Sequence, residues 1–216
     1  AQDNPIIKLS IKARKKGFIK SGQYGTAVEK IDQAGFDAQQ KVEDLLSQYD
    51  DDTLVLSGYN HTRVKINDFI RQKRFFEPQI EPVEGDRVIC LRNNHEKNIY
   101  NGMLGTIINI KPFEDDFYKV QIEMDIDDQV FQGKVLKDQF GAKSTMSRTK
   151  EGNKIPDDVD LFDFGYALTV HKAQGSQARR VILFEERFKQ MNDQQWRRWL
   201  YTGITRAQEE LFLIGS

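Results

Sequence analysis

The spacing of apolar residues at the start of the chain alternates between the periods of helices and strands. The predicted elements are a helix over residues 3–15, a helix over 42–49, a strand over 53–56 and a helix over 64–76. Asp3 is the predicted cap of the first helix, and Pro5 suits its first turn. One face of the second helix carries Val42, Leu45, Leu46 and Tyr49. Helix, strand and helix in this order are typical of a parallel sheet covered by helices.

Beyond this segment the pattern changes to short apolar runs separated by turn residues. The change falls near Pro78 and Pro82, and the predicted strands cover residues 86–91, 105–110, 117–124 and 129–136. Asn101-Gly102 and the acidic stretch 114–116 mark two of the turns. Short strands at this spacing predict a small antiparallel β-barrel, of the SH3 type or close to it. The polar segment 141–154 is predicted to be a linker or mobile loop.

The alternation of strand and helix returns after this polar segment. The predicted elements are a strand over 162–170, a strand over 181–184, a helix over 192–207 and a strand over 211–214. The predicted fold class is therefore α/β, a parallel sheet with helices on both faces, interrupted by the small SH3-type barrel. The predicted domain limits are 1–82 and 153–216 for the α/β domain and 83–152 for the inserted barrel.

Composition narrows the class of protein. The chain has 216 residues, 38% hydrophobic and 30% charged, and no apolar run approaches the roughly 18 residues of a membrane span. Cys90 is the only cysteine, so an internal disulfide is excluded and a reducing compartment is expected. The net charge of −1 argues against binding nucleic acid by bulk charge, although it is compatible with a narrow basic groove. The start at Ala1 rather than Met indicates a piece of a longer protein.

The first candidate site is the run from Tyr166 to Ser176, where a predicted strand ends in polar residues. Thr169, His171 and Lys172 come at its carboxyl end, the edge at which open parallel sheets bind their ligands. Hydroxyl, imidazole and ammonium groups at one edge suit phosphate contacts, and Gly175 permits a close backbone approach. Each residue taken singly also fits a solvated strand end, whereas the whole run favours a contact with nucleic acid.

The second candidate site is the helix that begins at Asn192, which forms a capping pair with Gln195. Its apolar face, assigned to the core, carries Trp196, Trp199, Leu200 and Gly203. Arg206 lies at the edge of this face, where its guanidinium can enter a cleft and meet a phosphate held by a neighbouring domain. An arginine that extends from an amphipathic helix into solvent explains the same pattern, and the pattern does not separate the two readings.

Together the two runs resemble motifs V and VI of superfamily 1 helicases, in the form found in the RecD-like and Dda-like group. Motif V of that group reads T-x-H-K-x-Q-G-S and is matched from Thr169 to Ser176, and motif VI reads Y-x-x-x-T-R-A and is matched from Tyr201 to Ala207. Residues 59–63 with Asn67 are similar to the motif IV region, and residues 4–7 resemble the segment after motif III. The inserted barrel matches domain 2B of these enzymes in position.

The resemblance implies the second RecA-like domain, 2A, of an ATP-dependent DNA helicase that moves 5′ to 3′, with 2B inserted. In the family, ATP and Mg²⁺ bind between two RecA-like domains, and the N-terminal domain supplies the phosphate loop and the Mg²⁺-binding carboxylates. The implied partners are single-stranded DNA and the N-terminal RecA-like domain of the same polypeptide, with no membrane. The implied setting is the cytoplasm of a bacterial or phage-infected cell, in DNA replication or repair.

The resemblance also assigns roles to single residues. Arg206 corresponds to the arginine finger that stabilises charge on the γ-phosphate, and Arg63 reaches the same phosphate. The nucleotide side of the site also includes Gly175, Ser176 and Gln177. The residues assigned to single-stranded DNA are Thr169, His171, Lys172, Gln174 and Asn60.

Two departures from the family pattern bear on activity. Gln177 stands where many members carry an acidic residue for the ribose, although an amide also hydrogen-bonds a hydroxyl. No G-x-x-x-x-G-K-[ST] loop occurs in the chain, nor a Walker B carboxylate pair at a strand end. We therefore expect this chain alone not to hydrolyse ATP. The alternative function is a non-catalytic single-stranded nucleic-acid-binding module derived from the same domain.

No metal site is predicted from the sequence. The acidic stretch 123–128 fits the solvent face of a strand, and His61 and His95 have no neighbouring Cys or His at ligand spacing. The basic run from Lys12 to Lys20 fits a solvated helix end better than a nucleic-acid patch.

Overall fold

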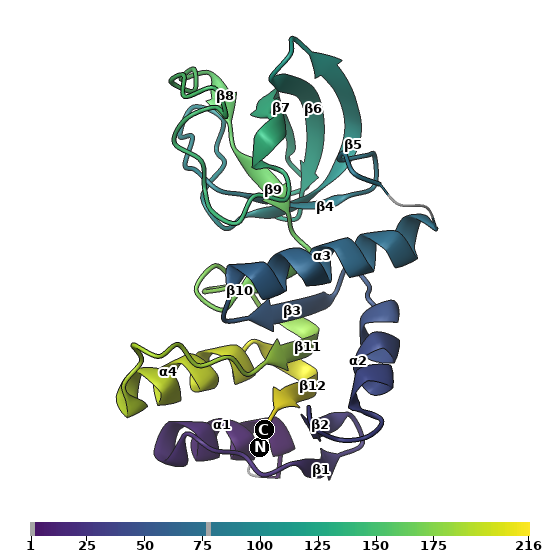
Figure 1. Ribbon diagram of the computed structural model, residues 1–216, viewed down its shortest axis with the longest axis vertical. Coiled ribbons are helices and arrows are strands. Elements are labelled where there is room, and N and C mark those ends of the chain that lie inside the picture. Colours follow the sequence, from purple (N-terminus) through teal and green to yellow (C-terminus); the bar gives the residue numbers. More distant parts are fainter. Residues whose placement is uncertain (1–2, 77–78) are drawn as a thin grey trace. The chain divides into compact units, whose positions relative to one another are not determined.

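The computed structural model describes residues 3–76 and 79–216, so Ala1 and Pro78 lie outside the described residues. The chain divides into two compact units (Figure 1). The parallel-sheet unit consists of the residues up to Arg63 together with Ala167–Ser216, and the antiparallel unit is Val64–Tyr166. The domain limits at residues 82 and 152 stay predictions, whereas the compact units themselves change at residues 63 and 166.

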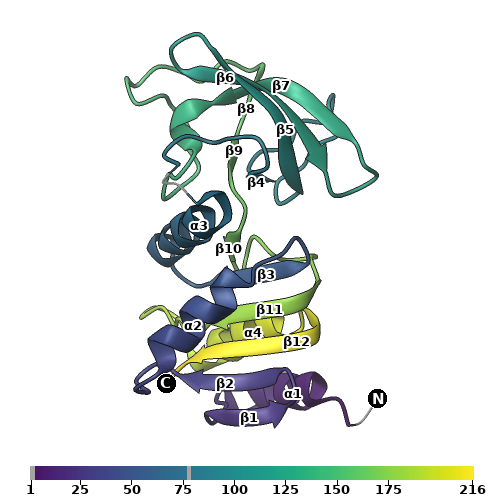
Figure 2. The ribbon, with the colours of Figure 1, turned by 90° about the vertical axis from the view of Figure 1, so that its right-hand side faces the viewer.

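Six strands form the sheet of the parallel-sheet unit, in the order β1-β2-β12-β11-β3-β10. Their bounds are β1 Gly22–Gly25, β2 Val28–Asp32, β3 Thr53–Ser57, β10 Ala167–Thr169, β11 Ala178–Phe184 and β12 Ala207–Gly215. β1 runs antiparallel to β2, and the other neighbouring pairs are parallel. The sheet has helices α1 (Pro5–Lys16) and α4 (Asp193–Ile204) on one side and α2 (Ala38–Ser47) on the other, as Figure 2 also shows. The predicted α/β class is confirmed.

The predicted strands at residues 53–56, 181–184 and 211–214 lie side by side in the middle of this sheet. Every residue of β3 is buried, as are Val181, Ile182 and Leu183 of β11. The sequence pattern does not predict β1 and β2, which are short and contain Gly, Glu and Lys. β2 exists because its backbone pairs with β12, from Leu211↔Val28 to Gly215↔Asp32, a contact between distant parts of the chain.

Local capping decides where α1 and α4 begin and end. The side chain of Asn4, not the predicted Asp3, caps α1 by accepting a hydrogen bond from the backbone N–H of Ile6 at 2.8 Å. Asn192 and Gln195 form the predicted capping box of α4. The predicted helix 192–207 is too long, because α4 ends at Ile204 and Ala207 already belongs to β12.

The helix α3 (Asn60–Phe75) begins four residues before the predicted start at Val64. The reason is Glu186, whose carboxylate accepts hydrogen bonds from the backbone N–H groups of Gly58 and Tyr59 at 3.0 and 3.1 Å and from the Thr62 hydroxyl at 2.6 Å. A carboxylate at this position satisfies free donors and suits the positive end of the helix. Because Glu186 follows β11, the sequence around α3 gives no sign of this start.

The antiparallel unit contains a second sheet in the order β8-β7-β6-β5-β4-β9. Its bounds are β4 Arg87–Cys90, β5 Leu104–Phe113, β6 Phe117–Met124, β7 Val130–Leu136, β8 Val159–Asp160 and β9 Phe162–Phe164, with a 3₁₀ turn, η1, at Lys137–Gln139. The four predicted strands of this region appear as β4 to β7. The sheet curls into a nearly closed barrel around buried side chains that include Val88, Ile122 and Phe131 (Figure 1). Residues 141–154 contain no helix and no named strand, only an isolated bridge between Arg148 and Lys154.

The single strand predicted over residues 162–170 is wrong, because this segment supplies one strand to each sheet. β9 pairs with β4 in the antiparallel sheet, and β10 pairs with β3 in the parallel sheet. Gly165 stands between them, where an added Cβ would lie 2.8 Å from the backbone of Val88. A mostly apolar run therefore conceals a change of sheet.

A buried charged network joins α3 to the second sheet inside the antiparallel unit. The guanidinium of Arg71 donates to both carboxylate oxygens of Asp86, at 2.9 and 3.0 Å, and lies 3.8 Å from the ring centroid of Phe164. The hydroxyl of Tyr166 donates to the same carboxylate at 2.7 Å, and burial raises the pKa of that hydroxyl well above its usual range. Asp86 is completely buried. Within the described part of the chain, no helix has the length and apolar character needed to cross a membrane.

Candidate functional site

The first candidate run lies at the carboxyl edge of the parallel sheet, as predicted. Thr169 ends β10 in register with Ser57, which ends β3, and the backbone N–H of Val170 donates to the Ser57 carbonyl at 3.1 Å. The Thr169 carbonyl then accepts from the N–H groups of Lys172 and Ala173, which turns the chain. We call residues 170–177 the strand-end loop. His171 and Gln174 are exposed, and Thr169 and Lys172 are half-buried.

Gly175 allows the strand-end loop to return toward the sheet. Its φ is +89°, in the left-handed region that glycine adopts most readily, and open space surrounds the position of a Cβ. The N–H of Ser176 donates to the carbonyl of Ala173 at 3.0 Å. The loop therefore needs glycine at this position for its backbone conformation, and its outer surface stays open.

Arg206 lies between the end of α4 and the start of β12, and its side chain contacts the strand-end loop. Its Nε donates to the carbonyl of Thr202 at 3.1 Å, and its Nη1 donates to the carbonyl of Ser176 at 3.2 Å. The backbone reinforces this contact, since the N–H of Ala178 donates to the Arg206 carbonyl at 3.0 Å. Arg206 and the predicted nucleotide residues Gly175, Ser176 and Gln177 are thus brought together.

The charge of Arg206 is not neutralised by the residues that the structure describes. Arg206 is half-buried, and none of the described carboxylates forms an ion pair with it. Arg179 and Arg180 in the same unit differ, because both pair with Glu210. A half-buried guanidinium that bonds only to carbonyl and hydroxyl oxygens retains its attraction for an anion.

A pocket of about 530 Å³ opens between the strand-end loop, the segment after β11 and α4. Its lining includes two of the residues predicted to contact DNA, His171 and Gln174. The other lining residues are Val170, Phe188, Gln190, Met191, Gln195, Arg198, Trp199 and Thr202. Thr169, Lys172 and Asn60 do not line this pocket. Phe188 and Met191 were not predicted, because their one signal is their place just beyond the carboxyl end of a central strand.

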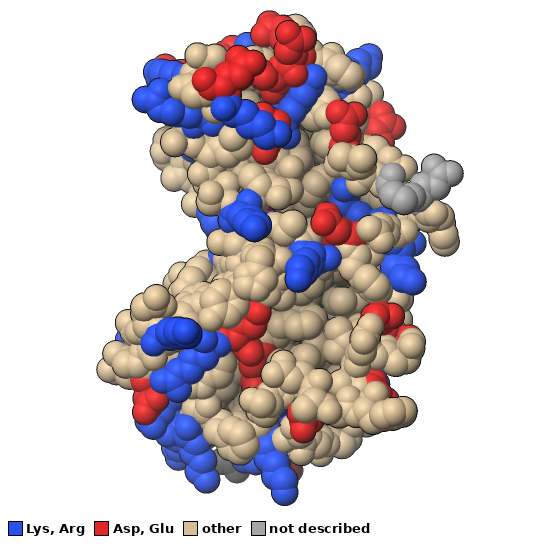
Figure 3. Space-filling view, in the orientation of Figure 1, with Lys and Arg blue, Asp and Glu red and all other residues tan. Residues whose placement is uncertain are grey.

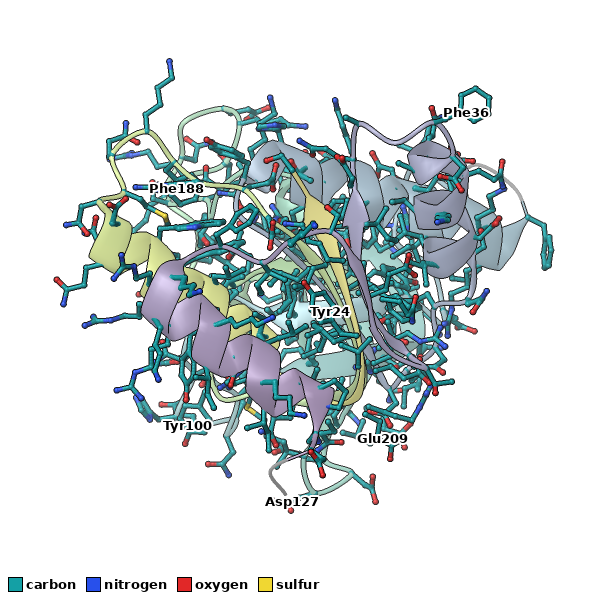
Figure 4. All side chains as sticks on the ribbon, turned by 90° about the horizontal axis from the view of Figure 1, so that it is seen from below. Tyr24, Phe36, Tyr100, Asp127, Phe188 and Glu209 are labelled. Atoms are coloured by element: carbon teal, nitrogen blue, oxygen red, sulfur yellow. The ribbon has the colours of Figure 1, made fainter. Side chains whose placement is uncertain are left out.

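An aromatic group beside this pocket was also missed from the sequence. The rings of Tyr59 and His61 stack with centroids 5.2 Å apart, and the ring of Phe188 meets Tyr59 edge-on at 4.8 Å. Phe188 lies on the loop that runs beside α4 (Figure 4). The Tyr59 hydroxyl donates to the carbonyl of Arg187 at 3.1 Å, which fixes the position of the ring.

The remaining predicted residues stand at the start of α3. Asn60 is exposed, and its side-chain oxygen accepts a hydrogen bond from Nε of Arg63 at 3.2 Å. Arg63 is only 8% exposed, so most of its side chain is enclosed within the protein. Its contact with a nucleotide stays a prediction.

Comparison with known proteins bears on the same segments. The family described as the UvrD-like helicase C-terminal domain matches residues 164–214, which contain both candidate runs. The ATP-dependent RecD2 DNA helicase of Deinococcus radiodurans is 29% identical over 148 residues, which are 66% of this chain and 16% of that protein. These two matches support a likeness to the C-terminal portion of a RecD-like superfamily 1 helicase.

Solved structures are similar to this chain in fold. A Pif1 helicase from Bacteroides, crystallised with ADP-AlF3 and single-stranded DNA, superposes with a TM-score of 0.55 at 17% identity, covering 97% of this chain and 48% of that one. A Pif1 helicase from a study of forked duplex DNA superposes with a TM-score of 0.53 at 17% identity, covering 97% of this chain and 46% of that one. The chain thus spans less than half of each of these two structures and about a sixth of the RecD2 relative.

Charged side chains of the parallel-sheet unit lie both on its surface and in its core. Basic side chains gather over α1 and α4 (Figure 3). In the interior of the same unit, Lys30 of β2 forms a buried ion pair with Glu185, which directly follows β11. Burial raises the pKa of the Glu185 carboxyl, and Lys30 opposes that rise. This pair belongs to the core and not to the exposed site.

The donors at the candidate site suit phosphate better than a metal ion. Arg206 and the open backbone around Gly175 offer hydrogen-bond donors and positive charge. No cluster of three or more His, Cys, Asp or Glu side chains placed to hold a metal occurs within residues 3–76 and 79–216.

Proposed function

We propose that this chain is the C-terminal motor half of an ATP-dependent DNA helicase that moves 5′ to 3′ in the bacterial or phage-infected cytoplasm. In this proposal the parallel-sheet unit serves as domain 2A, and the SH3-type barrel serves as domain 2B, with domain limits at residues 82 and 152. The proposal rests on Arg206, a half-buried guanidinium held against the strand-end loop without a carboxylate partner among the described residues.

Arg206 would act on a nucleotide held mainly by an N-terminal RecA-like domain of the same polypeptide. A planar guanidinium donates two parallel hydrogen bonds to phosphate oxygens and stabilises the charge that develops during phosphoryl transfer. Its bonds to the Thr202 and Ser176 carbonyls fix the stem while leaving further donors for the phosphate. Arg63, Gly175, Ser176 and Gln177 would complete the nucleotide side, and the N-terminal domain would hold the Mg²⁺ that offsets phosphate charge.

The strand-end loop would couple the nucleotide to the DNA. One end of the loop contacts Arg206 through the Ser176 carbonyl, and the other end supplies His171 and Gln174 to the pocket. Thr169, His171, Lys172, Gln174 and Asn60 would contact the phosphates of single-stranded DNA. Any movement of the guanidinium toward a phosphate therefore pulls on the segment that holds the strand.

The test is Arg206→Lys in the whole protein, which retains a positive charge but removes the planar fork. Loss of an arginine finger lowers kcat by about 10³–10⁵, so we expect ATP turnover to fall by at least about 10³ while the affinity for single-stranded DNA stays unchanged. Arg148→Ala is the matched control, because this exposed arginine also donates to a backbone carbonyl, that of Gly152 at 2.9 Å. Turnover equal in the two variants would overturn the finger assignment.

A second measurement separates the motor from a non-catalytic binding module. The chain by itself should show no ATP hydrolysis, even with saturating single-stranded DNA, because it contains no G-x-x-x-x-G-K-[ST] loop. Added to its N-terminal domain, it should restore DNA-stimulated hydrolysis. A chain that binds DNA but never supports hydrolysis in the whole protein would be the binding module instead.

A further inference from the structure

The outer face of the antiparallel sheet carries three lysines side by side. Strand register places Lys111 of β5 opposite Lys119 of β6, and Lys119 opposite Lys134 of β7. Residues directly opposite each other in a sheet point to the same face, and the alternating neighbours Val120 and Val135 are buried on the other face. Lys111 and Lys119 are exposed and Lys134 is half-buried, so the row faces solvent.

This row is unfavourable for folding by itself, because like charges opposite each other on neighbouring strands repel. Only Lys134 has a counter-charge, through its ion pair with Asp158. Within the described residues, Lys111 and Lys119 form no ion pair with a carboxylate. The Nζ of Lys119 instead lies 3.9 Å from the ring centroid of Phe113, which shares the face with Lys111. Two uncompensated positive charges therefore stand next to each other on an open surface.

The neighbouring row on the same face is made of amides. Asn109, Gln121 and Gln132 lie opposite one another, two residues along each strand from the lysines. Both rows border a shallow hollow of about 560 Å³, whose lining includes Lys119, Lys134 and Phe113. Amide side chains both donate and accept hydrogen bonds, so they suit base edges as well as water.

We propose that this face binds a single strand of nucleic acid, with phosphates along the lysine row and bases over the amides and the Phe113 ring. Positive charge on a groove with an aromatic ring is the combination that single-strand-binding proteins use. A duplex fits less well, since its bases are read by an element that protrudes into a groove, whereas this sheet face is a shallow hollow. The acidic turn at Glu114 and Asp115 lies beyond Phe113 and limits the site at that end.

The proposed site and the strand-end loop belong to different units of the chain, and the proposed site does not depend on the helicase proposal. Its residues all belong to the antiparallel unit, whereas Thr169, His171 and Arg206 belong to the parallel-sheet unit. The two sites can therefore be tested separately in one intact chain. A His171→Ala background removes a contact proposed at the strand-end loop and leaves the lysine row unchanged.

The experiment is lysine footprinting with an acetylating reagent, with and without a short oligothymidine, read by mass spectrometry on the full chain. We expect protection of Lys111 and Lys119 and no protection of Lys143, an exposed lysine in the same unit but outside this face. The same protection should appear in the His171→Ala variant. Two results would overturn the proposal: loss of this protection in the His171→Ala variant, or equal protection of Lys111, Lys119 and Lys143 by oligothymidine.

Binding measurements supply the second test. The double variant Lys111→Gln with Lys119→Gln removes two phosphate contacts, so the salt slope of oligothymidine binding should decrease by about 1.4, at about 0.7 for each contact with a single strand. The matched control, Lys143→Gln with Lys150→Gln, should retain the original slope. Equal slopes for the two double variants would contradict the site. Protection of Lys111 and Lys119 by a duplex but not by oligothymidine would overturn the assignment to a single strand.

Discussion

Replacing Asp86 with Asn tests whether the buried network holds α3 on the antiparallel sheet. The carboxylate accepts four hydrogen bonds: two from Arg71 at 2.9 and 3.0 Å, one from the Tyr166 hydroxyl at 2.7 Å and one from the N–H of Val83 at 2.8 Å. The amide keeps the size and shape of the side chain. It removes the negative charge and replaces one acceptor with a donor that faces other donors.

The expected loss of stability follows from the burial of this ion pair. Both partners are almost fully enclosed, with Asp86 at 0% and Arg71 at 2% exposure. Removing one partner of a buried pair costs about 3–5 kcal/mol, because a charge is left without compensation. Arg71 keeps its bonds to the carbonyls of Gln79 and Glu81, at 2.7 and 2.8 Å, so the lower end applies, about 3 kcal/mol. For a chain of this size that loss lowers Tm by roughly 6–12 °C.

Urea unfolding followed by far-ultraviolet circular dichroism measures this loss. The chain has two tryptophans, Trp196 and Trp199, and both lie in the parallel-sheet unit. Tryptophan fluorescence therefore reports on that unit, while circular dichroism reports on both. We expect the variant to shift the dichroism transition to lower urea more than the fluorescence transition.

Two controls make the result decisive. Asp158→Asn changes a carboxylate that also pairs with a cation, Lys134, but is 63% exposed, so stability should hardly change. Joint replacement of Asp86 and Arg71 by Leu and Met removes both charges and should cost less than Asp86→Asn alone. If Asp86→Asn unfolds at the same urea concentration as Asp158→Asn, the network does not hold the helix.

Three further outcomes are expected. Gly17→Ala should destabilise the chain by about 1 kcal/mol or more in thermal unfolding, and by more than Gly141→Ala. Both glycines have a positive φ, but only at Gly17 would the added Cβ meet a side chain of α4, at 3.0 Å. Lys30→Met should lower the free energy of unfolding by about 3–5 kcal/mol at pH 7, because the buried Glu185 carboxylate loses its counter-charge. Burial raises the folded-state pKa of Glu185, so protonation of this carboxyl stabilises the fold at low pH, and that stabilisation is lost as pH rises. The effect of Lys30→Met should therefore shrink as pH falls toward about 4.3, and an effect that does not change with pH would contradict this. His171→Ala in the whole protein should weaken single-stranded DNA binding or uncouple it from ATP hydrolysis, and an unaltered DNA-stimulated rate would argue against its role.

Local sequence was a sound guide where a structure depends on neighbours in the chain. The capping box of Asn192 and Gln195 formed as predicted, because both partners lie within one turn. The start of α3 was misplaced, because its cap, Glu186, is far away in sequence. The change of sheet near Gly165 was missed for a similar reason, since β9 and β10 pair with β4 and β3, which are far away in sequence.

The residues of the candidate site also fall into those predicted from nearby sequence and those that only tertiary contacts bring together. Motif spacing indicated Thr169, His171 and Arg206. The structure places Thr169 and His171 at the carboxyl edge of the sheet, and Arg206 at the amino end of β12, where it contacts the strand-end loop as that loop enters β11. The aromatic group of Tyr59, His61 and Phe188 was not predicted, since it joins segments from the ends of two different strands. The helicase comparisons cover residues 164–214 most directly, the segment in which motif residues are closest in sequence.

The sequence by itself determined the α/β class, the central strands, the two motif runs and the lack of a phosphate loop, because these depend on periodicity and on residues close together in the chain. Only the tertiary structure decided that Arg206 contacts Ser176 and that three lysines stand in one row. Strand pairing sets such contacts, and a shift of one residue would turn each lysine toward the core. The side-by-side placement of these lysines therefore depends on the strand register of the folded chain.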